Sequence, residues 1–176
     1  TQDVSTAGKT SATIPAGGTG PTITVSNLAR QLGEAAVRAE TRDASLSRKE
    51  LGQKATAQLD QIIGDQYYIN KAKHDAEVPN TDDPELLARA KQATSFVNGQ
   101  GKNPFAGLSP DQLTLVIYDD SGTFTVNERQ AAWQEQKETL QAQKDQKAAE
   151  VAAAQKALVL TQTLFGQAEA KAEAAA

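Results

Sequence analysis

The sequence predicts an all-α protein, in which a small domain of helix–loop–helix units carries a long C-terminal helix. Apolar residues recur at spacings of three and four through the middle of the chain, which is the period of one helix face. Capping patterns, such as Ser or Thr with Glu or Gln three residues later, mark several helix starts. From Gln134 onward the chain is polar and then rich in alanine, the residue with the highest helix propensity.

The composition limits the size of the apolar core. Leu, Ile, Val and Phe make up 33 of the 176 residues, close to the level at which chains begin to lack a packed core. We therefore expect a helical core domain over residues 26–133 and a disordered N-terminal tail over residues 1–25. Residues 134–176 are expected to form an extended helix rich in Ala, Gln and Lys, with a frayed end.

The beginning of the chain, residues 1–24, is rich in Thr, Ser and Gly and shows neither helical nor strand periodicity. Such a segment cannot bury enough apolar surface to offset its ordering entropy, so we expect a flexible tail. Bacterial export systems can use tails of this kind, although linkers have the same composition. An exported bacterial effector, similar to harpins, is therefore one hypothesis for the function.

Two helices are expected after the tail. Ser26 can N-cap a helix that ends near residues 42–43. Ser47 and Glu50 form a capping box, which predicts the start of a second helix. Gly64–Asp65 is a plausible break, after which the helix continues or a shorter one begins.

The next helix is expected to begin at Pro84, with Asp83 as its N-cap. Proline has no backbone N–H, but the N–H of the first helical residue has no partner within the helix, so its absence costs nothing there. Asn98 and Gly99 tolerate the backbone angles that end a helix. In the Gly/Asn/Pro-rich loop that follows, Phe105 is expected to anchor the chain on the core.

Two structures are open for residues 113–126. In the segments LTLVIY and TFTV, apolar and polar residues tend to alternate, and β-branched residues are frequent. Both features favour a β-hairpin around the turn Asp-Asp-Ser-Gly. Ser109, Pro110 and Gln112 form a helix start instead, and we favour the helix.

The last helix opens at a further capping box, Thr125 with Glu128. Trp133 follows on this helix and is expected to pack on the core, with a partner-facing hot spot as the alternative.

Farther along the last helix, Val151, Leu158 and Phe165 recur every seven residues. This short coiled-coil pattern predicts a helix-packing surface. Gly166 marks the expected start of fraying.

Residues 117–128 hold oxygen-bearing side chains at the spacing of a calcium loop. Such a loop needs oxygen ligands at positions 1, 3, 5 and 9, Gly at position 6 and a bidentate Glu at position 12. With Gly122 at position 6, position 1 is Ile117, whose side chain has no oxygen. The candidate metal-binding residues are Asp119, Asp120, Ser121, Thr123, Thr125 and Glu128. This stretch resembles the EF-hand family.

Residues 39–50 keep the second half of the same pattern, with Ser47 at position 9. The chain is thus similar to the EF-hand family over two stretches of about thirty residues each. The resemblance implies paired helix–loop–helix units, whose position-8 residues Leu46 and Phe124 form a short antiparallel bridge. Calcium binding stays open beside the simpler interpretation, in which the same residues only cap helices.

The middle segment, residues 74–113, is also similar to a group of uncharacterised bacterial proteins. This resemblance implies that residues 26–133 form one folding unit, and it implies no activity.

Charge and residue types exclude several classes of protein. The net charge is −4 and no Lys/Arg cluster occurs, so we expect no nucleic-acid binding. No apolar run reaches the roughly 18 residues of a membrane span. The absence of cysteine excludes disulfides and zinc–thiolate sites. The N-terminus lacks a signal-peptide pattern, so cytoplasmic location and export without a visible signal peptide both stay open.

We therefore expect a non-enzymatic helical protein with an interaction or structural role and no cofactor, since no nucleophile elbow, phosphate loop or HExxH motif occurs. Its partner is an unknown protein or a second copy, bound through the C-terminal helix. The candidate partner-binding residues are Trp133, Val151, Leu158 and Phe165. The alternatives are a calcium-binding EF-hand-like module and the exported effector.

Overall fold

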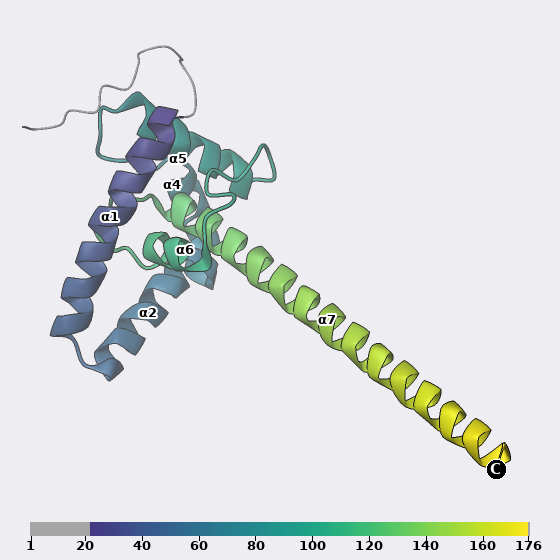
Figure 1. Ribbon diagram of the computed structural model, residues 1–176. Helices are drawn as coiled ribbons and strands as arrows, with labels where there is room; N and C mark the ends of the chain where they lie inside the picture. The colour runs from purple at the N-terminus through teal and green to yellow at the C-terminus, as the bar shows by residue number, and fades with distance from the viewer. Residues whose placement is uncertain (1–21, 176) are drawn as a thin grey trace, which may run out of the picture.

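The computed structural model describes residues 22–175, which form seven helices and no strand. In chain order the helices are α1 (Thr22–Ser45), α2 (Arg48–Ile63), α3 (Asp65–Ile69), α4 (Lys71–Asp75), α5 (Pro84–Val97), α6 (Pro110–Ile117) and α7 (Val126–Ala174). The prediction of an all-α fold with a long C-terminal helix is confirmed (Figure 1). The predicted tail over residues 1–25 lies outside the described residues, except for residues 22–25, which belong to α1.

Side-chain caps begin most helices where the sequence predicts. The hydroxyls of Ser47, Ser109 and Thr125 each accept a hydrogen bond from the backbone N–H three residues later. Asp83 Oδ1 accepts the N–H of Glu85 at 2.9 Å and begins α5. These caps satisfy backbone donors that have no partner inside the helix. Local capping therefore determines where α2, α5, α6 and α7 begin.

Helix α1 differs from its prediction at both ends. It begins at Thr22 rather than after Ser26, and it runs to Ser45 rather than to residues 42–43. Residues 39–45, which the EF-hand resemblance places in a loop, are therefore helical. No glycine or proline interrupts residues 34–46, and the Ala, Arg and Glu residues among them have high helix propensity.

The bridge expected between Leu46 and Phe124 is absent from the part of the chain that the structure describes. The Leu46 N–H donates instead to the Arg42 carbonyl at 3.1 Å. Phe124 is buried, and its ring lies edge-on to the ring of Phe105, with 6.3 Å between the ring centroids. Leu46 thus completes the end of α1, while Phe124 is a core residue.

Residues 110–117 form α6, so the hairpin alternative is wrong. Leu113, Val116 and Ile117 share one helix face and have no exposed surface. β-Branched residues have only slightly lower helix propensity than other apolar residues, and burial of this face outweighs that difference.

Helix α7 is continuous over 49 residues and passes through Gly166 to Ala174. The helix is therefore not interrupted at Gly166, and the expected fraying beyond this residue stays a prediction. A glycine inside a helix costs about 1 kcal/mol relative to alanine, and the alanine-rich surroundings offset this cost.

The core lies where α5 and α6 pack against the first turns of α7. Ile62, Ala93, Phe105, Ala131 and Ala132 are fully buried there. The predicted anchoring role of Phe105 is thereby confirmed.

Beyond this core, α7 leaves the domain as a single extended helix (Figure 1). Every described residue from Leu140 onward is exposed. We call residues 140–174 the arm, and residues 126–132 the root of α7.

Candidate functional site

The loop between α6 and α7 contains most of the predicted metal-binding side chains. Asp119 is buried, and its Oδ1 accepts a hydrogen bond from Arg38 Nε at 2.9 Å. Its Oδ2 lies 2.6 Å from Ser121 Oγ, which lies 2.8 Å from Thr123 Oγ1. Gly122 has a φ of 83°, which suits the sharp turn that a calcium loop makes at its sixth position.

Asp120 points to a different partner. It forms an ion pair with Lys54 of α2. The hydrogen bond from Lys54 lowers the pKa of Asp120 below its ordinary value, against the opposing effect of burial. Because Asp119 pairs with Arg38 of α1, the two carboxylates connect this loop to two different helices.

The position-12 carboxylate, Glu128, lies in the core. Its Oε2 accepts a hydrogen bond from Arg89 Nε, and its Oε1 accepts the Thr125 N–H at 3.1 Å. The Arg89 guanidinium lies 5.6 Å and 5.1 Å from the ring centroids of Phe105 and Phe124. Burial raises the pKa of Glu128, and the charge of Arg89 opposes this shift. Glu128 is therefore both a helix cap and half of a buried ion pair.

The structure does not bring the predicted metal-binding residues into one site. Asp119, Ser121 and Thr123 lie together, whereas Asp120 and Glu128 point to other partners. Thr125 acts as the N-cap of α7. Among residues 22–175, no group of three or more His, Cys, Asp or Glu side chains is placed to hold a metal ion.

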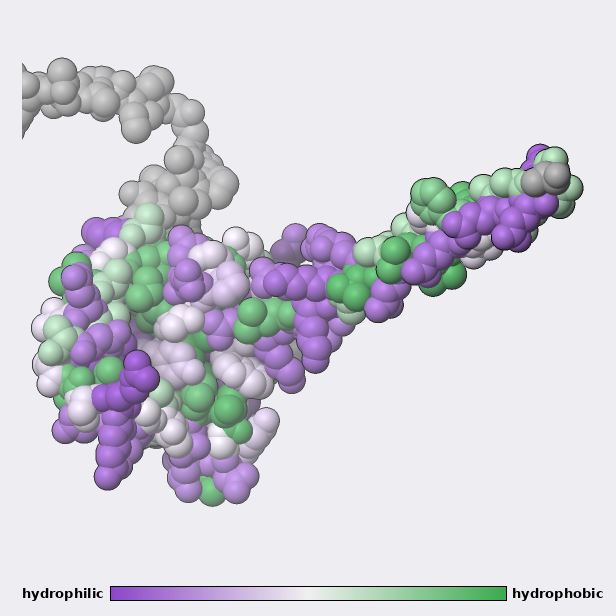
Figure 2. All heavy atoms as spheres, turned by 60° about the horizontal axis from the view of Figure 1, so that its bottom comes forward, coloured by the Kyte–Doolittle hydropathy of each residue, from purple (hydrophilic) through white to green (hydrophobic). Residues whose placement is uncertain are grey.

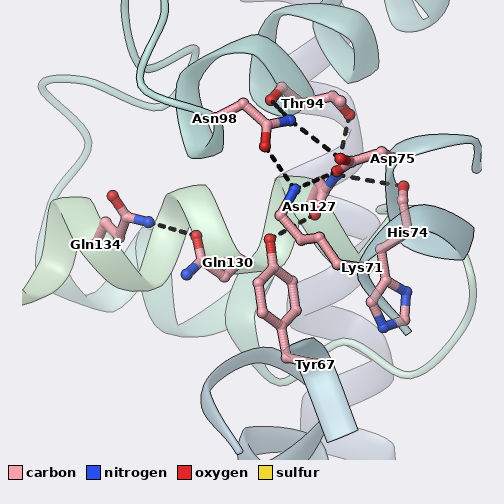
Figure 3. A network of polar contacts seen from close by, with 9 residues as sticks. All are labelled: Tyr67, Lys71, His74, Asp75, Thr94, Asn98, Asn127, Gln130 and Gln134. Atoms are coloured by element: carbon pink, nitrogen blue, oxygen red, sulfur yellow. Dashed lines mark hydrogen bonds and ion pairs between the residues drawn. The ribbon is translucent and has the colours of Figure 1, made fainter. Parts of the chain in front are cut away.

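Asn127, a fully buried residue in the root of α7, is the centre of a partly buried polar network (Figure 3). Its Nδ2 donates to the His74 carbonyl at 3.2 Å and to Asp75 Oδ1 at 2.9 Å. The same nitrogen lies 3.1 Å from Thr94 Oγ1. Its Oδ1 accepts the Tyr67 hydroxyl at 2.9 Å. One fully buried side chain thus joins α3, α4 and α5 to α7.

Two titratable groups of this network have shifted pKa values. Burial raises the pKa of Asp75, but hydrogen bonds from Lys71, Asn127 and Asn98 outweigh burial, so the pKa lies below its ordinary value. Burial, followed by the charge of Asp75, raises the pKa of Tyr67 to about 12. At neutral pH, Tyr67 is therefore a protonated donor beside an ionised Asp75.

Arg129 completes the attachment of the root. Its Nε donates to the Ile117 carbonyl at 2.8 Å, at the end of α6. Its two amino groups bind Gln61 Oε1 at 2.9 Å and the Gln58 carbonyl at 3.1 Å, both in α2. Sequence reasoning missed Arg129, Asn127 and Arg89, because periodicity analysis assigns polar helix residues to the solvent face. The sequence contained one indication that these residues are buried. Asn127 and Arg129 flank Glu128 of a capping box, and Arg89 lies on a helix with an apolar face.

A groove of about 360 Å³ lies between α1, α2 and the end of α6. Apolar side chains such as Ala35, Leu51 and Leu115 line it, together with charged residues that include Asp119 and Asp120. These charges already form ion pairs, with Arg38, Arg42 and Lys54 as the cations. The groove therefore offers mainly apolar surface.

The predicted partner-binding residues of the arm are exposed. The exposed fractions are 56% for Val151, 59% for Leu158 and 69% for Phe165. Their seven-residue spacing places them on one face of the helix. Leu160 and Leu164 are also exposed. Figure 2 shows hydrophobic residues gathered on the far part of this helix beside hydrophilic ones.

Trp133 lies between the root and the arm. It is half-buried and packs against the core. Lys137 Nζ lies 5.3 Å from the centroid of its ring. The structure thus gives Trp133 the core contact expected of it and leaves part of its surface open.

Within the described residues, none of the helices combines the length and the hydropathy that crossing a bilayer requires.

Comparisons of the chain with models of protein families, with curated proteins and with solved structures gave no match. The resemblances to the EF-hand family and to uncharacterised bacterial proteins stay predictions from the sequence. The export hypothesis depends on residues 1–24, of which residues 1–21 lie outside the described residues.

Proposed function

We propose that this protein is a non-enzymatic interaction protein, in which the helical domain holds the arm as a binding surface for another helix. One observation carries the proposal: a continuous helix extends from the domain with large apolar side chains exposed along it.

The exposed face of the arm gains free energy when a partner covers it. Fully burying a Val, Leu or Phe side chain contributes roughly 1.5–3 kcal/mol. Val151, Leu158 and Phe165 are each more than half exposed, and contiguous exposed apolar surface marks interaction sites. The seven-residue repeat favours an α-helix as the covering element, because that spacing keeps one face toward a neighbouring helix.

The domain supports this role by fixing the direction of the arm. Asn127, Glu128 and Arg129 are buried in the root, and each binds a different set of helices. The arm continues the same helix without a break. The domain therefore presents the apolar face of the arm in one orientation.

Site-specific photo-crosslinking in cells that naturally produce the chain tests this proposal. A benzophenone amino acid replaces Phe165 on the apolar face, and the same substitution at Ala149, on the opposite side of the helix and away from the other exposed large apolar residues, is the control. We expect covalent adducts of one discrete mass from position 165 and few from position 149. Equal labelling at both positions, or no adduct at either, contradicts the proposal.

A further inference from the structure

We propose that the helix covering the arm belongs to a second copy of this chain and runs antiparallel to it. The inference rests on the proposed function and adds the identity and orientation of the partner. In this pairing, Val151 faces Ala168 of the second copy, Leu158 faces Thr161, and Phe165 faces Ala154.

The two kinds of core position on the arm differ in size. Val151, Leu158 and Phe165 occupy one core position of the heptad, and the other holds Ala154, Thr161 and Ala168. In an antiparallel pair each large position faces a small one, so every layer contains one large and one small residue. In a parallel pair identical positions meet, which crowds the Phe165 layer and leaves gaps at the Ala layers.

The flanking positions match the same alignment. Glu150 of one copy lies opposite Lys171 of the other, and twofold symmetry makes this pair occur twice. Along the same edge, Ala157 lies opposite Leu164. In a parallel pair, Leu164 lies opposite Glu169 instead, and no opposite charges meet across that edge. The arm therefore has charge complementarity for the antiparallel arrangement.

One register also fits the length of the arm. In the proposed register, Ala174 lies opposite Asp145 of the second copy. The last half-buried residue of that copy's domain is Thr139. The end of the arm therefore stops roughly 9 Å along the helix before it would reach the domain. The paired segments then overlap over roughly 45 Å. Sliding one copy by seven residues toward the domain of the other places Phe165 opposite Lys147. The apolar contact of Phe165 with Ala154 is then lost.

Sedimentation velocity and light scattering of the full chain test self-association. We expect a mass approaching twice 18.6 kDa at tens of micromolar and above, and a monomer for Leu158→Glu. A chain that ends after Lys144 is expected to be monomeric with an unchanged Tm, because every described residue it lacks is exposed. A full chain that stays monomeric up to about 1 mM, the weak end of protein association, overturns the inference.

Cysteine cross-linking tests the orientation, since the native chain has no cysteine. In the proposed pairing, a mixture of Val151→Cys and Ala168→Cys chains forms a disulfide between the two different chains. Each variant alone does not cross-link, because the two copies of one position are roughly 25 Å apart, beyond the reach of a disulfide. Disulfides within either single-variant sample indicate a parallel pair and overturn the inference.

Charge reversal at the flanking pair tests the register. Glu150→Lys and Lys171→Glu each place like charges opposite one another, and each alone is expected to weaken self-association about tenfold. An equimolar mixture of the two variants restores opposite charges at both contacts, so we expect near-native affinity. A mixture that stays as weak as the single variants overturns the register.

The two proposals fail differently. A purified chain that is monomeric, together with adducts from position 165 that contain a different protein, overturns the second-copy partner and leaves the proposed function intact. The absence of adducts from position 165 contradicts both the proposed function and the second-copy partner.

Discussion

The root of α7 places three consecutive polar residues in the interior of the domain. Glu128 pairs with Arg89 of α5, Asn127 binds Asp75 of α4, and Arg129 donates to α6 and α2. A buried charge left without its partner costs roughly 3–5 kcal/mol, and an unsatisfied buried polar group costs roughly 1–3 kcal/mol. Since the three side chains bind different sets of helices, a rotated helix leaves some of them unpaired. We infer that this polar root specifies the orientation of the arm.

Tyr67 in this network predicts a loss of stability at alkaline pH. Burial and the charge of Asp75 raise its pKa from the ordinary value of 10.0 to about 12. The folded state holds the phenolic proton more tightly than the unfolded state, so this stabilisation is present below pH 10 and is lost as the pH rises toward 12. We expect the free energy of unfolding, from urea titrations, to fall across this range more steeply in the native chain than in Tyr67→Phe. Parallel pH profiles for the two proteins contradict this assignment.

At the scale of elements, a loop over residues 118–125 joins α6 to α7. The loop has the glycine turn at Gly122 and an oxygen cluster at Asp119, Ser121 and Thr123. The carboxylates of Asp119 and Asp120, however, form ion pairs with basic side chains of α1 and α2. The carboxylate of Glu128 points into the core. The loop therefore acts as a connection between helices.

This arrangement predicts that calcium does not stabilise the protein. Binding at the loop requires Glu128 to leave Arg89, which leaves a buried arginine unpaired at a cost of several kcal/mol. We expect the thermal melt, followed by circular dichroism, to give the same Tm in millimolar calcium and in chelator. A rise in Tm with calcium that Glu128→Gln abolishes contradicts this prediction and favours the calcium-binding alternative.

Helix boundaries were predictable from sequence wherever a cap sets them, because a cap depends on residues only two or three apart. Ser47, Asp83, Ser109 and Thr125 all begin helices as expected. The extent of α1 was not predictable in the same way, since the candidate cap Ser26 lies inside the helix and no glycine or proline marks its C-terminal end. The pair of Arg89 and Glu128 joins residues 39 apart in sequence, and hydrophobic periodicity carries no information about such long-range polar contacts.

At the scale of the whole molecule, residues 22–175 consist of a helical domain and one long arm (Figure 1). The domain buries polar residues to fix the arm, and the arm exposes apolar residues along its length. A stretch of helix without tertiary contacts depends on its own propensity, so a covering helix stabilises the arm as well as binding to it. The antiparallel pair places the two domains at opposite ends, with the paired arms between them.

Amide hydrogen exchange over residues 145–174 of the full chain, measured as a function of protein concentration, tests this account most directly. An uncovered helix opens readily and exchanges fast, whereas a paired helix is protected. At protein concentrations of tens of micromolar, we expect these amides to be protected, as for a pair of intermediate affinity. The protection is expected to be lost on dilution. In Leu158→Glu, we expect fast exchange at every concentration. Equally fast exchange in the native chain and in Leu158→Glu at all concentrations contradicts the claim that a second copy covers the arm.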